Sequence, residues 1–66
     1  MQIIINGHII ETGENISLTE LIENQQLRND GIAIAVNDSI VPKGDWASTY
    51  LKNKDTLLII TATAGG

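Results

Sequence analysis

The residues of this chain that are best suited to do chemistry are its last two, Gly65 and Gly66. They follow the apolar run LLII at 57–60, which is typical of a buried strand. Chain ends are usually poorly ordered and glycine is costly to order, so the dipeptide alone is most simply a frayed end. The alternative is a reactive end. An α-carboxylate is ionised at neutral pH, so it must become an activated ester before a nucleophile can attack it.

The composition argues against several other kinds of chemistry. A chain of 66 residues forms one small domain with little room for an enclosed active site. It contains no cysteine, which excludes disulfides and thiolate zinc sites, and its single histidine, His8, has no second ligand nearby in sequence. No Ser-His-Asp set, phosphate-binding glycine loop or carboxylate pair stands out. We therefore predict that the chain is not an enzyme, binds no metal and holds no permanent cofactor.

Charge and targeting signals indicate where the chain works and what it avoids. The formal net charge of −4 and the aromatic content of 3% disfavour nucleic-acid binding. The sequence shows no signal peptide and no long apolar segment. We therefore expect a cytoplasmic protein that binds neither nucleic acid nor membrane.

The strands are predicted from apolar periodicity. The runs MQIII at 1–5 and HIIE at 8–11 are separated by Asn-Gly, which suits the positive φ angles of a type I′ hairpin turn. IAIAV at 32–36 alternates with period two, and SIV at 39–41 is a short strand that the following proline ends or confines to an edge. TLLIIT at 56–61 is the last strand.

One main helix is predicted over SLTELIENQQL, residues 17–27. Ser17 is the candidate N-cap, and Glu20 completes a capping box with it. The apolar residues share one face of this helix, so it is amphipathic. Gly31 suits the loop that follows it.

A second, shorter helical turn is predicted over DWASTYL, residues 45–51. Asp45 is its candidate cap. Trp46 and Tyr50 are spaced i, i+4, so we expect them to pack together beneath the turn.

This order of elements permits few folds. The main helix must cover one face of one sheet, because a lone sheet face and a lone helix stripe have to bury each other. With the last strand parallel to and beside the first, the result is an α+β fold of the β-grasp, or ubiquitin-like, type. It has a mixed sheet, one main helix packed on one face and a short helical turn. We expect this domain over 1–61 and a flexible tail over 62–66.

The strand periodicity also predicts an apolar patch on the uncovered face of the sheet. If Ile3 and Leu57 face the helix, then Ile4, Leu58 and Ile60 face outward. An apolar patch of this kind marks a site for a protein partner. The opposite register would instead place these three residues in the core.

Three segments resemble the ThiS family, the sulfur carriers of thiamine biosynthesis: MQIIING at 1–7, AIAVNDSIVPKGDW at 33–46 and KDTLLIITATAGG at 54–66. The similarity runs the length of the chain. Val41-Pro42 and Trp46 together with the terminal Gly-Gly are more specific than the glycines alone.

The resemblance implies a chemical role for the tail. An ATP-dependent, E1-like enzyme (ThiF-like) would adenylate Gly66, and sulfur from a persulfide donor would then convert it to a thiocarboxylate, 1-thioglycine. A thiazole synthase (ThiG-like) would receive this sulfur to build the thiazole ring. ATP would be used by the adenylating partner rather than held by this chain. The expected partner contacts are Gly65, Ala64, Thr63, Ala62, Ile60, Leu58 and Ile4.

The sequence leaves other functions open. The small subunit of molybdopterin synthase shares the fold and the terminal Gly-Gly. A ubiquitin-like interaction module would have the fold without the tail chemistry, and a protein modifier would be conjugated to lysines. The segment from Pro42 to Trp46 and the short length favour the thiamine-type carrier.

Overall fold

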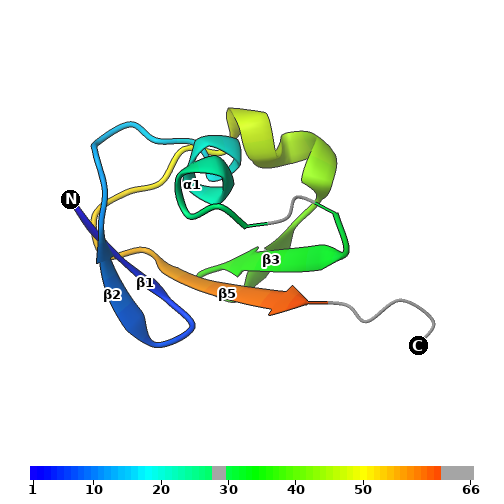
Figure 1. Cartoon of the computed structure of the whole chain (residues 1–66), viewed down its shortest axis with the longest axis horizontal. Coiled ribbons are helices and arrows are strands. Elements are labelled where there is room, and N and C mark those ends of the chain that lie inside the picture. The colour runs from blue at the N-terminus through cyan, green and yellow to red at the C-terminus, as the bar shows by residue number, and fades with distance from the viewer. Residues whose placement is uncertain (28–29, 62–66) are drawn as a thin grey trace.

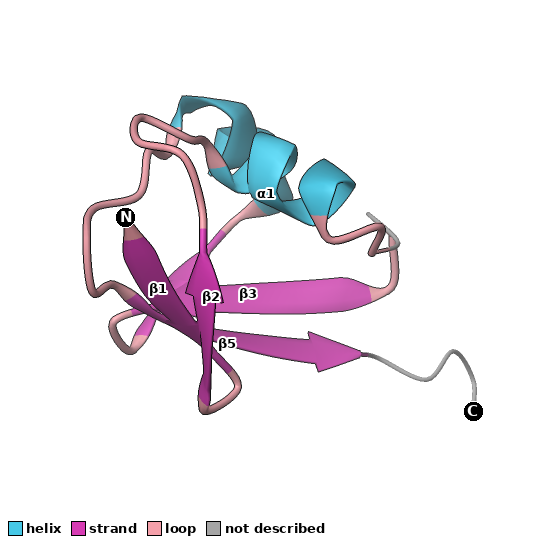
Figure 2. Cartoon of the chain, turned by 60° about the vertical axis from the view of Figure 1, so that its left-hand side comes forward, coloured by secondary structure: helices cyan, strands magenta, loops and turns pink. Residues whose placement is uncertain are grey.

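The computed structural model describes residues 1–27 and 30–61 and consists of one sheet with two helices on one side of it (Figure 1). In chain order, its elements are β1 (Gln2–Ile5), β2 (His8–Glu11), α1 (Leu18–Asn24), β3 (Ile32–Val36), β4 (Ser39–Val41), the 3₁₀ helix η1 (Lys43–Ser48) and β5 (Thr56–Thr61). Figure 2 shows α1 above the strands, so one face of the sheet is covered.

The sheet has five strands in the order β2-β1-β5-β3-β4. β1 and β5 run parallel, and the other neighbouring pairs are antiparallel. The first and last strands of the described chain therefore lie side by side, which confirms the predicted mixed sheet of the β-grasp fold. No described element covers the opposite face of the sheet, which we call the outer face.

The hairpin between β1 and β2 forms as the Asn-Gly signal predicts. Ile5 pairs with His8, which leaves a two-residue loop. Asn6 and Gly7 have φ angles of 51° and 84°. Both angles are positive, as a type I′ turn requires, and this turn matches the twist of the two strands.

The start of α1 also agrees with the sequence. The Ser17 hydroxyl accepts a hydrogen bond from the Glu20 amide at 3.1 Å, and the Ser17 amide donates to Glu20 Oε1 at 3.0 Å. This reciprocal capping box satisfies two of the amide groups that a helix start leaves unpaired.

The end of α1 comes earlier than predicted, at Asn24 rather than near Leu27. Gln26 adopts a φ angle of 58°, which ends the helical path. Its amide donates to the Glu23 carbonyl at 3.0 Å, and the Leu27 amide donates to the Ile22 carbonyl at 3.0 Å. These two bonds form a Schellman motif with glutamine where glycine is usual. The apolar pattern continues past this point, so it gave no sign of the stop.

The core lies between the covered face of the sheet and the two helices. Its buried members are Ile3, Ile16, Leu18, Leu21, Ile22, Ile34, Trp46, Leu51 and Leu57. They come from β1, α1, β3, η1 and β5 and from the segments beside them, so the core ties distant parts of the chain together. The indole N–H of Trp46 donates to the Val41 carbonyl at 2.9 Å, so its one polar group is satisfied while the ring is buried.

The short helix differs from its prediction in type, bounds and cap. It is a 3₁₀ helix that begins at Lys43, and its N-cap, Pro42, makes no side-chain capping bond. Asp45 lies inside the helix instead of capping it. Trp46 is buried beneath it as expected, but Tyr50 lies beyond its end and is 60% exposed. The expected packing of Tyr50 under the helix is therefore wrong, because the helix ends before it.

Candidate functional site

The candidate site is the end of β5 and the surface around it, because the tail begins there. β5 is a central strand between β1 and β3, and it ends at Thr61. Figure 1 shows it passing through the middle of the sheet. Five residues predicted to act in the tail lie outside the described residues: Ala62, Thr63, Ala64, Gly65 and Gly66. Their roles remain predictions.

The outward register predicted for β5 is confirmed. Leu58 and Ile60 are 51% and 50% exposed, whereas Leu57 between β1 and β3 is 1% exposed. Ile4 in β1 is half-buried and lies opposite Thr56, which shares its side of the sheet. The structure therefore brings Ile4, Leu58 and Ile60 to the outer face. Their binding role stays a prediction.

The outer face is wider than the sequence indicated. Ile9 in β2 pairs with Ile4, and Ile40 in β4 pairs with Ala35 in β3, which in turn pairs with Leu58. Directly paired residues share one face of a sheet. Ile9 and Ile40 are each 67% exposed. We call the resulting surface the outer apolar face; it comprises Ile4, Ile9, Ala35, Ile40, Leu58 and Ile60.

The sequence contains local signals that bear on the positions of Ile9 and Ile40. A two-residue turn at Asn6-Gly7 fixes the pairing of Ile4 with Ile9, so Ile9 could have been placed from the sequence. The two-residue turn at Asn37-Asp38 likewise fixes the pairing of Ile40 with Ala35, but its place near Leu58 depends on β3 lying next to β5. That adjacency is a property of the topology and not of local periodicity.

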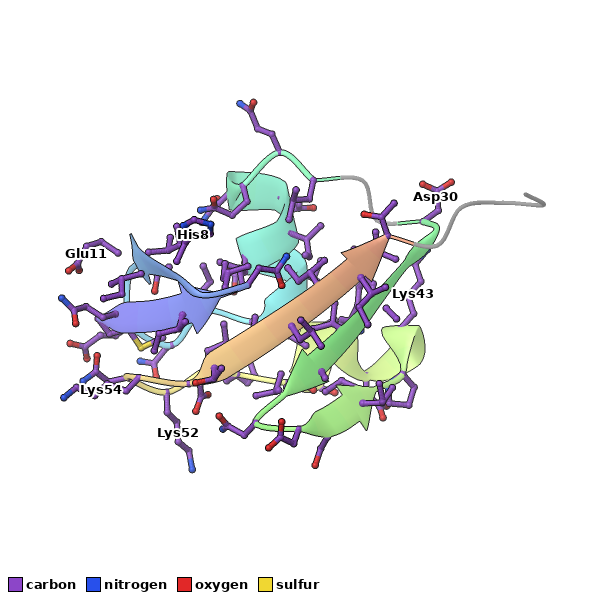
Figure 3. The ribbon with its side chains drawn as sticks, turned by 90° about the horizontal axis from the view of Figure 1, so that it is seen from below. His8, Glu11, Asp30, Lys43, Lys52 and Lys54 are labelled. Carbon is purple, nitrogen blue, oxygen red and sulfur yellow. The ribbon has the colours of Figure 1, made fainter. Side chains whose placement is uncertain are left out.

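Polar side chains border the outer apolar face at the end where β1 and β5 begin. Gln2 donates from Nε2 to Glu11 Oε1 at 3.1 Å, and these two residues are paired across β1 and β2. In Figure 3, Lys52 and Lys54 lie near the start of β5 and Asp30 near its C-terminal end. Glu11 is the one residue with a charged carboxylate or ammonium group within the described strands. An apolar centre with a polar border is typical of a protein-binding surface.

Two asparagine side chains form hydrogen bonds with the main chain of β5, one near its start and one near its end. Near its start, Asn37 Oδ1 accepts from the Thr56 amide at 3.0 Å, and Asn37 Nδ2 donates to Asp55 Oδ1 at 3.0 Å. Near its end, Asn6 Oδ1 accepts from the Ile59 amide at 2.8 Å, and Asn6 Nδ2 donates to the Ile59 carbonyl at 3.2 Å. Both asparagines have positive φ angles and belong to hairpin turns.

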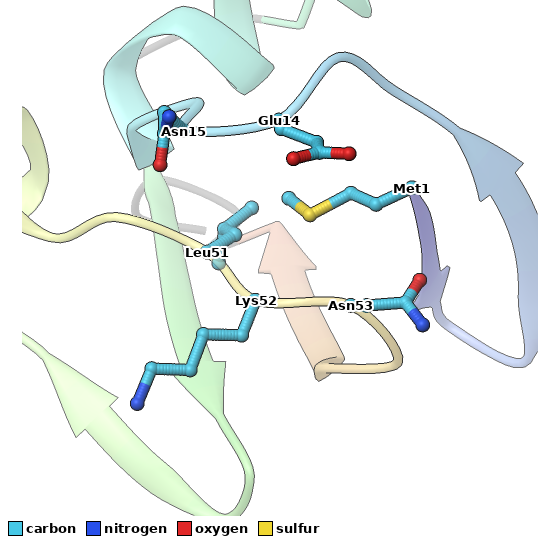
Figure 4. Close-up of a pocket in the computed structure, with 6 residues that line it drawn as sticks. All are labelled: Met1, Glu14, Asn15, Leu51, Lys52 and Asn53. Carbon is cyan, nitrogen blue, oxygen red and sulfur yellow. The ribbon is translucent and has the colours of Figure 1, made fainter.

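A hollow of about 560 Å³ lies at the opposite end of β5 from the tail (Figure 4). It is lined by Met1, Glu14, Asn15, Leu51, Lys52 and Asn53. The side chains of this lining include the Glu14 carboxylate and the Lys52 ammonium group but no hydroxyl, thiol or imidazole.

The described part of the chain contains neither a group of metal ligands nor a helix that could span a membrane. Within residues 1–27 and 30–61, no group of three or more His, Asp or Glu side chains could hold a metal ion. In the same part of the chain, none of the helices is long and apolar enough to cross a membrane.

Comparisons with known proteins agree with this geometry. The model of the ThiS family matches residues 3–66. The sulfur carrier protein ThiS of Escherichia coli strain K12 is 33% identical over 66 residues, which cover 100% of both chains. A crystal structure of the thiamine biosynthesis protein ThiS from Geobacter metallireducens superposes with a TM-score of 0.87 at 19% identity, with 100% of both chains covered. An NMR solution structure of a thiamine biosynthesis protein from the same organism gives a TM-score of 0.79 at 19% identity, over 100% of this chain and 88% of that one.

Proposed function

This chain belongs to the ThiS family, and from that premise we propose that its Gly66 is adenylated, converted to a thiocarboxylate and used as the sulfur donor for thiazole formation in thiamine biosynthesis. The observation that carries the proposal is that the family match extends to the terminal glycines, which follow the end of the central strand β5 by only a few residues. The tail residues after β5 are small, with no side chain larger than threonine, so they suit a narrow enzyme cleft.

The first step activates the tail. An oxygen of the Gly66 carboxylate attacks the α-phosphorus of ATP, an acyl–O–P bond forms and pyrophosphate leaves. The ionised carboxylate is a poor acceptor for a nucleophile, whereas the acyl-adenylate has a good leaving group in AMP. ATP belongs to the adenylating partner, which is of the E1-like, ThiF-like class.

The second step introduces sulfur. The terminal sulfur of a persulfide attacks the acyl carbon of Gly66 and AMP leaves, which gives an acyl disulfide. A second thiol then attacks the disulfide, so that a new disulfide forms on the donor side and the thiocarboxylate is released. This chain contains no cysteine, so the persulfide and the second thiol both come from partner proteins. A ThiG-like thiazole synthase then takes the sulfur.

The chain supplies an acyl group and a recognition surface, and the partners supply the catalytic groups. Glycine at the end of the tail lets the partner's groups approach the reacting carbon closely, because no Cβ stands in the way. We propose that the adenylating enzyme docks on the outer apolar face. Its central residues, Leu58 and Ile60, belong to the strand that leads into the tail, so docking there brings Gly66 into reach of the enzyme.

The test is intact mass spectrometry of the protein with ATP, an E1-like adenylating enzyme and a persulfide donor. We expect first the mass of the adenylate and then the mass change for replacing one oxygen by sulfur. Matched variants are deletion of Gly66, Gly66→Val and addition of one residue after Gly66. Each should stay folded, because the last residues lie beyond β5, but should form no thiocarboxylate.

The reason for this loss is geometric. Removal or addition of one residue moves the carboxyl carbon by about 3.5 Å. Misplacement of a reacting atom by ~1 Å can already cost on the order of 100-fold in rate. If the wild-type protein forms neither adduct, the chain is a binding module without tail chemistry. If the variants react as well as the wild type, the tail is not the reacting group.

A further inference from the structure

The partners of β5 change along its length. On one side, β3 pairs with β5 as far as Thr61. On the other side, β1 ends at Ile5, which pairs with Leu57. The last residues of β5 are therefore paired with β3 but extend beyond the end of β1. These are the residues from which the tail starts.

The side chain of Asn6 occupies the place where β1 would continue. Its Oδ1 accepts from the Ile59 amide at 2.8 Å and its Nδ2 donates to the Ile59 carbonyl at 3.2 Å. A side-chain amide carries one acceptor and a donor, as a peptide group does, so it can satisfy both backbone groups of one residue. Asn6 is in this position because its positive φ angle turns the main chain away from β5 into the hairpin loop.

We propose that Asn6 is a positioning residue for the tail reaction: its side-chain amide replaces the missing part of β1 and holds the end of β5 at Ile59. This inference rests on the proposed function for its kinetic consequence, but the hydrogen bonds themselves can be tested without it. The described contacts of the Asn6 side chain are with Ile59, so it acts through β5. It limits the motion of the strand that carries the tail, so that Gly66 is presented from a fixed starting point.

The effect on the reaction follows from the need for alignment. Reacting atoms must be held in a near-attack arrangement, and a displacement of ~1 Å can cost on the order of 100-fold in rate. Loosening of β5 at Ile59 spreads the positions of the tail without shortening it, so we expect a smaller loss, of about tenfold in kcat. The outer apolar face is unchanged, so the KM for the carrier should stay within about twofold.

The test variant is Asn6→Gly. Glycine adopts positive φ angles freely, and Gly-Gly is accepted in a type I′ turn, so the hairpin is kept while the amide is removed. Asn6→Asp is a second variant. Aspartate also tolerates this backbone conformation and keeps the acceptor for the Ile59 amide, but it cannot donate to the Ile59 carbonyl. We expect an intermediate kcat for it.

The matched control is Asn37→Gly. Asn37 also has a positive φ angle and also bonds the main chain of β5 with its side chain, but at Thr56, the start of the strand. Its loss should lower the stability of the domain about as much as the loss of Asn6, because each side chain makes two hydrogen bonds, one of those from Asn37 being to the Asp55 carboxylate. If stability alone governed the reaction, the control would be impaired as well. We expect its kcat to remain that of the wild type.

The first measurement is amide hydrogen exchange by NMR on the free full-length protein. In Asn6→Gly, exchange at Ile59 should accelerate by about tenfold or more, while exchange at Leu21 in α1 should change only with global stability. Unchanged exchange at Ile59 would overturn the proposed hydrogen-bonding role, whatever the tail does.

The second measurement is the rate of thiocarboxylate formation with the wild-type protein alongside. Three results together support the positioning role. The wild-type protein reacts, Asn6→Gly has a lower kcat with an unchanged KM, and Asn37→Gly has the kcat of the wild type. Equal loss in Asn6→Gly and Asn37→Gly would overturn it in favour of simple stabilisation. A wild-type protein that does not react would refute the proposed function, and the exchange data would still decide whether Asn6 holds β5.

Discussion

Leu57 and Leu58 are neighbours of the same type in β5, yet their environments are opposite. Leu57 is 1% exposed and belongs to the core, whereas Leu58 is 51% exposed on the outer apolar face. Successive side chains of a strand point to opposite faces of the sheet, so one strand can serve two purposes. β5 therefore carries more apolar side chains than the core of this domain buries.

The two faces differ in what their apolar side chains contribute to folding. Burial of a leucine side chain contributes roughly 1.5–3 kcal/mol relative to leaving it exposed. Leu57 gains this contribution within the domain itself. Leu58 and Ile60 are half-exposed in the free domain, so much of their potential burial is left for a partner. We therefore expect the covered face to control stability and the outer apolar face to control association.

The largest expected effect is on the covered face. Leu57→Ala should lower the free energy of unfolding by about 2–5 kcal/mol, because it removes buried methyl groups and leaves a cavity in a small core. The measurement is chemical denaturation followed by circular dichroism. Leu58→Ala is the matched control, and it should cost only about 1 kcal/mol, because about half of that side chain stays exposed in the folded domain. Similar losses in both variants would show that the two faces are not distinct.

The sequence predicted that β5 has one covered and one outward side, with the opposite register left open, because strand geometry and one covering helix suffice for that. Side chains of a strand alternate between the two faces, so one covering helix leaves only two registers. The structure has the one in which Ile3 and Leu57 are buried. The capping box of Ser17 and the Asn-Gly turn were predicted for the same reason: each is a local signal with its own hydrogen bonds.

The features that the sequence did not predict depend on tertiary context. The stop of α1 at Asn24 uses Gln26 in a left-handed conformation, which is uncommon for glutamine and leaves no mark in the apolar pattern. The union of Ile40 and Leu58 in one surface depends on the pairing of β3 with β5. The bond from Asn6 to Ile59 joins residues 53 positions apart, and only the parallel pairing of β1 and β5 brings them together.

The next effect in size concerns the outer apolar face. Leu58→Lys or Ile60→Glu should leave the domain folded but weaken its use by the adenylating enzyme. Removal of an apolar side chain from the centre of an interface can cost about 2 kcal/mol or more, which corresponds to a roughly 30-fold higher KM. Steady-state adenylation with varied carrier concentration measures this. Unfolding of either variant would show that Leu58 or Ile60 is needed for the stability of the domain and not only for binding.

A smaller effect is expected at the start of the helix that covers the sheet. Ser17→Ala removes the acceptor for the Glu20 amide and should lower stability by about 1 kcal/mol. Glu23→Ala on the exposed side of the same helix is the control, with a change within about 0.5 kcal/mol. Thermal unfolding compares the two. A loss for Ser17→Ala no larger than that of the control would mean that the capping box does not support the covered face.

The smallest effect is expected at the edges of the outer apolar face. Ile9 and Ile40 are its most exposed members at 67%, but they lie on the two edge strands, β2 and β4. Binding energy concentrates near the centre of an interface, and the surrounding contacts are close to neutral. Ile9→Ser and Ile40→Ser should therefore raise the KM for adenylation by only about twofold and change stability by no more than about 0.5 kcal/mol. The same steady-state assay used for Leu58→Lys measures this. An effect as large as that of Leu58→Lys would move the centre of the docking surface away from β5 and towards the edge that carries the affected isoleucine.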